Sequence, residues 1–257
     1  MLKALRFLAL MLPVMAAGAA QAAEDRQSLW RIVRTCASAY RLAGISFPCL
    51  KVDLPGGAAE RGYAVLRPLK SDDLILSPTR QTVGVEDPFL QSADAPNYFA
   101  AAWHARSFLK GLDGNPPPRD QVALIVNSQG SRSEDQLHIH IGCLRPDARR
   151  FLAAAAQRLP LNEWTRVGPI VPGQVYFGER VTETDFEQLN PFRIAAHGFV
   201  GAAENTGRLM VVAVGARVRD ADDLLIVAFF EGVSGSLRHS GAESLFDRDC
   251  TAASPLD

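Results

Sequence analysis

Residues 122–144 restrict the possible folds more than any other segment of this 257-residue chain. The segment begins with five apolar residues, VALIV, continues through a polar loop, and ends with residues 136–144, in which polar and apolar side chains alternate. Side chains along a strand point alternately to the two faces of a sheet, so the pattern predicts two neighbouring strands. The first strand is expected to be buried on both faces, and the second is expected to have one polar face.

The rest of the chain predicts a mixture of helices and short strands. Helical spacing of apolar residues occurs at 28–40, 96–111 and 147–159. Strand patterns occur at 50–54, 63–66, 74–76, 174–177, 209–214 and 224–230, and residues 77–96 have the composition of a loop. Strands that can pair antiparallel, together with a few helices, indicate an α+β fold.

The N-terminus has the pattern of an export signal. A basic start with Lys3 and Arg6 precedes an apolar stretch and the small-residue site Ala20-x-Ala22. We interpret residues 1–22 as a signal peptide, with an uncleaved membrane anchor as the alternative. Either interpretation places the folded part in the periplasm or on the periplasmic face of the inner membrane. The balance of 27 basic and 28 acidic residues argues against a nucleic-acid partner.

The four cysteines are expected to form two disulfides. Cys36, Cys49, Cys143 and Cys250 include no C-x-x-C pair, and an even number in an exported protein is typical of structural disulfides. Three pairings are possible. We favour Cys36–Cys49 with Cys143–Cys250, because Cys143 ends a strand and Cys250 lies in a polar tail that needs to be tied down.

The polar face of the second strand carries Gln136, His138 and His140, and it allows three interpretations. The histidines can be merely hydrogen-bonded, they can bind zinc with a third histidine, or one of them can attack a phosphate. The loop before them contains Gly and Ser and can offer backbone N–H groups to an anion, which favours the third interpretation. The histidines that could complete a zinc site are His104, His197 and His239.

Residues 127–141 resemble the histidine-triad (HIT) superfamily of nucleotidyl hydrolases and transferases, with QLHIHI at 136–141 in the place of the triad. A more complete set of motifs, over residues 28–250, resembles the bacterial CDP-diacylglycerol pyrophosphatase family. These motifs lie at 87–88, 95–99, 102–106, 127–128, 136–141 and 145–147. The resemblance implies one domain over 28–250, with a HIT-like antiparallel sheet and flanking helices in a catalytic core at 48–150. A C-terminal extension at 160–250 would add strands to this sheet, as a partner subunit does in dimeric HIT proteins.

The resemblance also implies roles for individual residues. His138 would be the nucleophile that attacks the α-phosphorus, and His140 would assist with protons and contact the phosphate. Gln136 replaces the first histidine of the triad, which puts the usual hydrogen-bond relay in question, and it is itself an implied substrate contact. The remaining implied substrate contacts are Asn127 and Ser133 (with Ser131 as the alternative) at the ribose and phosphate, and Arg132 opposite the phosphate charge.

The function implied by the resemblance is hydrolysis of CDP-diacylglycerol to CMP and phosphatidate through a nucleotidyl-histidine intermediate. It requires no metal or other cofactor, and the membrane surface would be the source of the lipid. Two alternatives remain: a HIT-like hydrolase of soluble nucleotides or nucleotide-sugars, and an inactive periplasmic lipid-binding protein. Asp53, Asp72 and Asp73 are expected to be solvated carboxylates in turns rather than metal ligands, because no cluster of ligands surrounds them.

Overall fold

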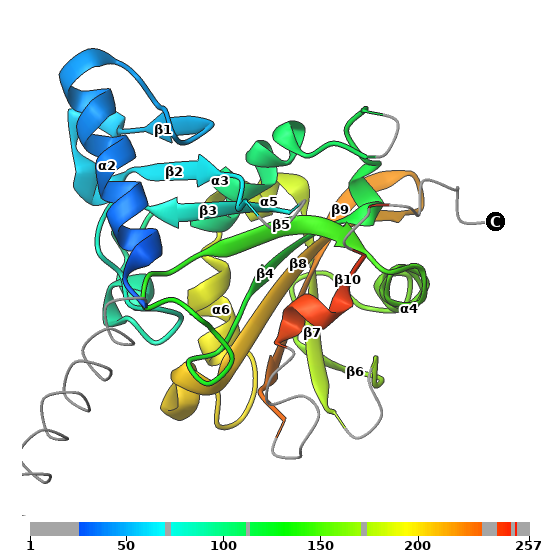
Figure 1. Ribbon diagram of the computed structural model, residues 1–257. Coiled ribbons are helices and arrows are strands. Elements are labelled where there is room, and N and C mark those ends of the chain that lie inside the picture. Colours follow the sequence, from blue (N-terminus) through cyan, green and yellow to red (C-terminus); the bar gives the residue numbers. More distant parts are fainter. Residues whose placement is uncertain are drawn as a thin grey trace, which may run out of the picture.

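A single antiparallel sheet organises the protein in the computed structural model (Figure 1). The structure describes residues 26–69, 73–111, 114–170, 174–232, 241–247 and 250, so the N-terminal signal interpretation lies outside it. Among these residues the strand order is β1-β2-β3-β5-β4-β8-β9-β7-β6, and β10 also pairs with β5. The strands are β1 Lys51–Asp53, β2 Tyr63–Leu66, β3 Leu74–Pro78, β4 Val122–Val126, β5 Ile139–Leu144, β6 Thr165–Val167, β7 Tyr176–Thr182, β8 Leu209–Val218, β9 Ala221–Phe230 and β10 Phe246–Asp247.

Helices cover both faces of this sheet. They are α2 Ser28–Ala43, α3 Tyr98–Ala105, α4 Pro146–Ala156, α5 Glu183–Gln188 and α6 Pro191–His197. Helices α3, α5 and α6 bury aromatic side chains, such as Trp103 and Phe192, against one face. Helix α4 packs on the opposite face, and α2 packs on that face over β1 and β2. The α+β prediction is confirmed.

Short 3₁₀ turns connect many of these elements. They are η1 Pro55–Gly57, η2 Ala59–Arg61, η3 Pro88–Gln91, η4 Arg106–Phe108, η5 Arg119–Gln121, η6 Ala203–Arg208 and η7 Ala242–Leu245. The helix expected over 96–111 is shorter, because α3 begins after the Asn97 cap and gives way to η4 at Arg106. None of the described helices is long and apolar enough to cross a membrane.

The C-terminal part of the chain continues the sheet of the N-terminal part. Strand β4 pairs antiparallel with β8, with Ala123 opposite Val214 and Val126 opposite Val211. Strands β9, β7 and β6 then follow β8 outward. The expected C-terminal set of strands therefore extends the same sheet within one chain, and the two parts share their apolar cores.

The second strand of the 122–144 segment starts later than its sequence pattern suggests. Strand β5 begins at Ile139, because residues 136–138 lie beside the segment that follows β3, where the Leu137 N–H donates to the Thr82 carbonyl at 2.6 Å. The alternation nevertheless holds. Leu137, Ile139 and Ile141 enter the core beneath α3.

Two disulfides confirm the favoured pairing. Cys36–Cys49 joins α2 to the segment before β1, and Cys143–Cys250 joins β5 to the C-terminal segment. In both cases the cystine connects an element of the sheet or its covering helix to a segment with little regular structure of its own. The described part of the chain contains no free cysteine.

Candidate active site

The side chains of His138 and His140 lie on the sheet face between α2 and α4. His140 stands opposite Ile75 of β3 and Ile125 of β4. Directly opposite residues of paired strands share a face. Ile75 packs with the core beneath α2, and Ile125 packs with the core beneath α4. The histidines therefore occupy the position between these two helices, where the sheet is covered by loops.

His138 is held as a neutral ring with one nitrogen available. Its Nδ1 lies 2.7 Å from the main-chain oxygen of Gln136. A carbonyl oxygen can only accept a hydrogen bond, so Nδ1 carries the proton and Nε2 keeps its lone pair. Burial, with a further contribution from the nearby His140, lowers the pKa of His138 to about 3. The side chain is 7% exposed.

The surroundings of His140 shift its pKa in the opposite direction. Its Nδ1 lies 2.8 Å from Asp73 Oδ2, and its Nε2 lies 3.2 Å from Glu243 Oε1 without the geometry of a hydrogen bond. Burial by itself would lower the pKa of His140, but the hydrogen bond to Asp73 and the charges of Glu243 and Asp73 outweigh it, and the net shift is upward. The two imidazole rings are 4.9 Å apart. The site thus places a neutral imidazole beside one that favours the charged form.

Asp73 and Glu243 are the two site residues that sequence reasoning missed. Asp73 was expected to be a solvated turn carboxylate, and the structure corrects this: it lies just before β3 and on the same face as Ile75, where it meets His140. Glu243 lies in η7, 103 residues after His140. The alternation of β3 extended back by one residue offered a signal for Asp73, whereas nothing local in the sequence marks Glu243.

Asn127 connects the end of β4 to η7. Its side-chain amide donates to Glu243 Oε1 and its oxygen accepts from the Ala242 N–H at 2.9 Å. A Cβ on Gly241 would lie 2.6 Å from the Asn127 oxygen, so the close approach requires glycine there. The predicted contact of Asn127 with substrate stays a prediction. What the structure adds is that this side chain positions Glu243 beside His140.

Gln136 uses its side chain within the protein. Its amide nitrogen lies 3.2 Å from Ser77 Oγ, 3.0 Å from the Pro78 oxygen and 3.1 Å from the Arg80 oxygen, and its own oxygen accepts from the Thr82 N–H at 3.2 Å. Gln136 is fully buried. These bonds occupy the amide, so Gln136 holds the segment after β3 in this structure, and its predicted substrate contact stays a prediction. The hydrogen bond from His138 Nδ1 does not depend on the Gln136 side chain, because its acceptor is the main-chain oxygen of Gln136.

The loop between β4 and β5 is braced by ion pairs. Arg132 Nη1 lies 2.7 Å from Glu86 Oε2, and its Nη2 lies 3.3 Å from Asp135 Oδ1. The Arg132 guanidinium is therefore buried between two carboxylates. Its predicted contact with the substrate phosphate stays a prediction. Ser133 is exposed, whereas the Ser131 hydroxyl is buried and has no hydrogen-bond partner within the described part of the chain.

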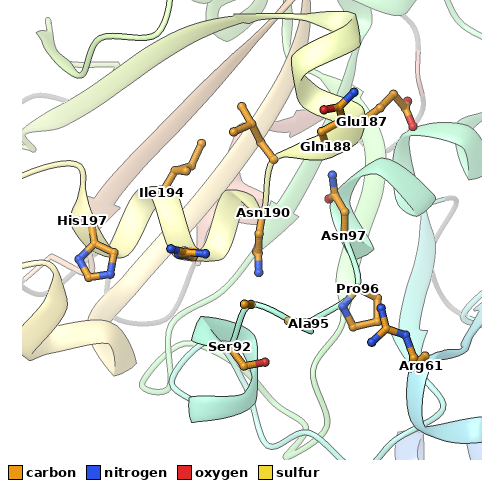
Figure 2. A pocket seen from close by; sticks show the side chains of 13 residues that line it. Arg61, Ser92, Ala95, Pro96, Asn97, Glu187, Gln188, Asn190, Ile194 and His197 are labelled. Carbon is orange, nitrogen blue, oxygen red and sulfur yellow. The ribbon is translucent and has the colours of Figure 1, made fainter.

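Two of the other histidines, His104 and His197, do not reach this site. His104 lies on α3, where its Nε2 is 3.0 Å from Glu187, and His197 ends α6; both helices cover the opposite face of the sheet. His197 instead lines a cleft of about 620 Å³ between α6 and residues 92–97 (Figure 2). His239 lies outside the described residues. No cluster of three or more metal-ligating side chains occurs among the residues that the structure describes.

Comparison with known proteins identifies the family. A family model described as CDP-diacylglycerol pyrophosphatase matches residues 24–254. A protein of Yersinia pestis named CDP-diacylglycerol pyrophosphatase is 34% identical over 230 residues, which cover 88% of this chain and 84% of that protein. The match to the family model extends over the histidine site and the C-terminal strands. The chain therefore belongs to the CDP-diacylglycerol pyrophosphatase family, a family of hydrolases.

Proposed function

We propose that this protein hydrolyses the pyrophosphate of CDP-diacylglycerol to CMP and phosphatidate through a covalent intermediate on His138. Membership of the family supports the substrate and the reaction. The observation that carries the covalent step is the environment of His138: its Nδ1 donates to the Gln136 oxygen, which leaves Nε2 as an unprotonated nucleophile. The same bond supports a relation to the HIT superfamily, in which a histidine at this position has this role.

In the first step, Nε2 of His138 forms a bond to the α-phosphorus of the cytidylyl group. The bond from this phosphorus to the bridging oxygen breaks, and its electron pair leaves with phosphatidate. His140 donates a proton to the departing oxygen, which its raised pKa suits it to do. Two titratable groups whose environments push their pKa values apart are the arrangement that acid and base roles require.

In the second step, water attacks the phosphorus of the His138 adduct. A P–O bond forms, the P–N bond breaks, and CMP and the neutral imidazole are regenerated. His140, which has given up its proton, now accepts one from the attacking water. Asp73 and Glu243 hold the His140 ring through both steps, because each faces one of its nitrogens.

Arg132 is already paired with two carboxylates, so other groups must also balance the charge of the phosphates. In its charged form His140 offsets part of this charge directly beside the nucleophile, while Asp73 and Glu243 face the same ring. The Ser131 hydroxyl is the donor that we assign to the bridging or leaving oxygen. A buried hydroxyl without a partner is costly unless a ligand satisfies it, which supports Ser131 over the exposed Ser133.

We further propose that the protein works in the periplasm or on the periplasmic face of the inner membrane. The two disulfides support an oxidising compartment, since such bonds rarely persist in a reducing cytosol. The signal-like residues 1–22 support export.

Trapping the adduct is the test of this proposal. The enzyme is mixed with CDP-diacylglycerol, quenched in alkali because P–N bonds break in acid, and analysed by mass spectrometry of the intact protein and its peptides. We expect a CMP adduct on His138 in the presence of EDTA. Hydrolysis without any adduct would favour direct attack by water, and a requirement for a divalent ion would overturn the covalent mechanism. CDP-glycerol, run in parallel, shows whether a soluble nucleotide diphosphate is hydrolysed as readily.

A further inference from the structure

The segment between α2 and β1 exposes an unusual concentration of large apolar side chains. Leu42 is 89% exposed, Phe47 is 78% exposed and Ile45 is 55% exposed, and Leu50 is also exposed. We call residues 42–50 the apolar loop. It lies at the outer edge of the molecule, where α2 and β1 meet (Figure 1). Exposed apolar side chains are common singly, but a group of this kind marks a surface that binds something.

The apolar loop is tied down at both ends, so its side chains cannot fold back into a core. Helix α2 ends at Gly44, which has a left-handed φ of 68° and whose N–H donates to the Tyr40 oxygen. At the other end, Cys49 is bonded to Cys36 of α2, and the Leu50 N–H donates to the Val65 oxygen at 2.7 Å. These attachments present the tip to the solvent.

The charge around the apolar loop differs from that of the whole chain. The chain has a net charge of −1, yet residues 28–51 contain Arg31, Arg34, Arg41 and Lys51 and no Asp or Glu. Arg41 and Lys51 flank the loop directly, and among the described residues the one carboxylate paired with them is Asp53, 3.9 Å from Lys51. Apolar side chains flanked by basic ones suit the surface of an anionic bilayer, where the first enter the acyl region and the second meet lipid phosphates. A protein partner would more often present a groove for such a protruding tip, and nothing about this loop requires one.

The apolar loop is close to the candidate site across the sheet. Leu66 of β2 stands opposite Ile75 of β3, which stands opposite His140, and β1 lies beside β2. Three strand spacings separate β1 from β5, or about 14 Å at ~4.8 Å each. Helix α2 also covers the face that carries His140. A bilayer held at the loop therefore lies within the reach of a lipid headgroup from the site.

We propose that the apolar loop inserts into an anionic lipid surface and holds the histidine site against it. The proposal deepens the proposed function, because a membrane-docking element explains how a lipid substrate reaches His138. Its first test does not depend on activity.

That test measures insertion directly in the full chain. Phe47→Trp is compared with Val200→Trp, since Val200 is 99% exposed on the turn after α6, on the opposite face of the sheet. Vesicles of phosphatidylethanolamine and phosphatidylglycerol with brominated acyl chains are added, and the extra tryptophan emission is measured. We expect quenching and a blue shift for Phe47→Trp only, and much less with phosphatidylcholine. Equal quenching of both variants, or none of Phe47→Trp, overturns the proposal, the latter leaving a protein as the partner of the loop.

A second test separates docking from chemistry. For each variant, the rate on CDP-diacylglycerol in vesicles is divided by the rate on a dispersed short-chain analogue. Removing an inserted large apolar side chain costs about tenfold in partitioning, so Leu42→Ser with Phe47→Ser should lower this ratio by about 100-fold, and Val200→Ser should leave it unchanged. An unchanged ratio in the double variant overturns docking. Absence of hydrolysis of both substrates by the wild type overturns the proposed function instead, and leaves the quenching result to decide docking.

Discussion

The two sides of the histidine site treat identical imidazole rings in opposite ways. On the loop side, His138 hydrogen-bonds a neutral carbonyl oxygen, and burial, aided by the nearby His140, lowers its pKa to about 3. On the side formed by β3 and η7, His140 is equally buried, but it faces the carboxylates of Asp73 and Glu243, which favour its charged form. Burial alone does not decide which role a histidine takes. The role also depends on the charged groups that the fold places next to the imidazole ring.

Removing His138 should produce the largest effect. No other group described here combines an unprotonated ring nitrogen with this position, so His138→Ala should reduce CMP release by more than about 10⁴-fold. Thermal unfolding of the variant controls for loss of structure. If the folded variant retained as much activity as His140→Ala, the assignment of the two roles would be wrong.

Removing His140 should be less severe, because the nucleophile remains. We expect His140→Ala to lose about 10²–10⁴-fold in kcat, the usual contribution of a general acid. A nitrophenyl ester of CMP provides the sharper measurement, since its leaving group needs no proton. His140→Ala should recover most of its rate on this ester, whereas His138→Ala should not. Equal defects of His140→Ala on both substrates would argue against proton donation.

Asp73→Asn should reduce the difference in pKa between His138 and His140 while leaving both side chains in place. Asparagine can still accept a hydrogen bond from Nδ1, but it lacks the charge that raises the pKa of His140. The wild-type kcat/KM should fall on the alkaline side as His140 loses its proton, and the variant should show this limb at lower pH, with about tenfold lower activity above it. The acid limb should lie well below pH 6.5 in both, because the pKa of His138 is about 3. A limb that did not move would mean that Asp73 does not control this proton.

Gln136→Ala should have the smallest effect on catalysis. The substitution leaves the main-chain oxygen that orients His138, so kcat should change by only a few-fold. It removes four side-chain hydrogen bonds of a buried amide, which should destabilise the fold by about 1–3 kcal/mol in urea unfolding. A large loss of kcat in the folded variant would indicate that the Gln136 side chain contacts the substrate.

Features encoded by local pattern were predictable from the sequence. Alternation placed His138 and His140 on one face and their apolar neighbours in the core, because a strand imposes a period of two whatever surrounds it. The buried β4 was found with its bounds, because five consecutive apolar residues leave few alternatives. The disulfide pairing followed from where strands end and tails begin. Short elements such as α5, α6 and β6 were missed, since so few residues show little periodicity.

Features that depend on distant residues were decided only by the tertiary structure. The pKa of His140 is shifted upward because Asp73 and Glu243, 67 and 103 residues away, converge on it. Arg132 is buried between Glu86 and Asp135, which lie 46 residues before it and three residues after it. Electrostatic interaction acts through space and depends on distance and burial, neither of which is encoded in a local pattern. The sequence by itself therefore determined which residues face the site, and the fold decided in which direction the pKa of each histidine is shifted.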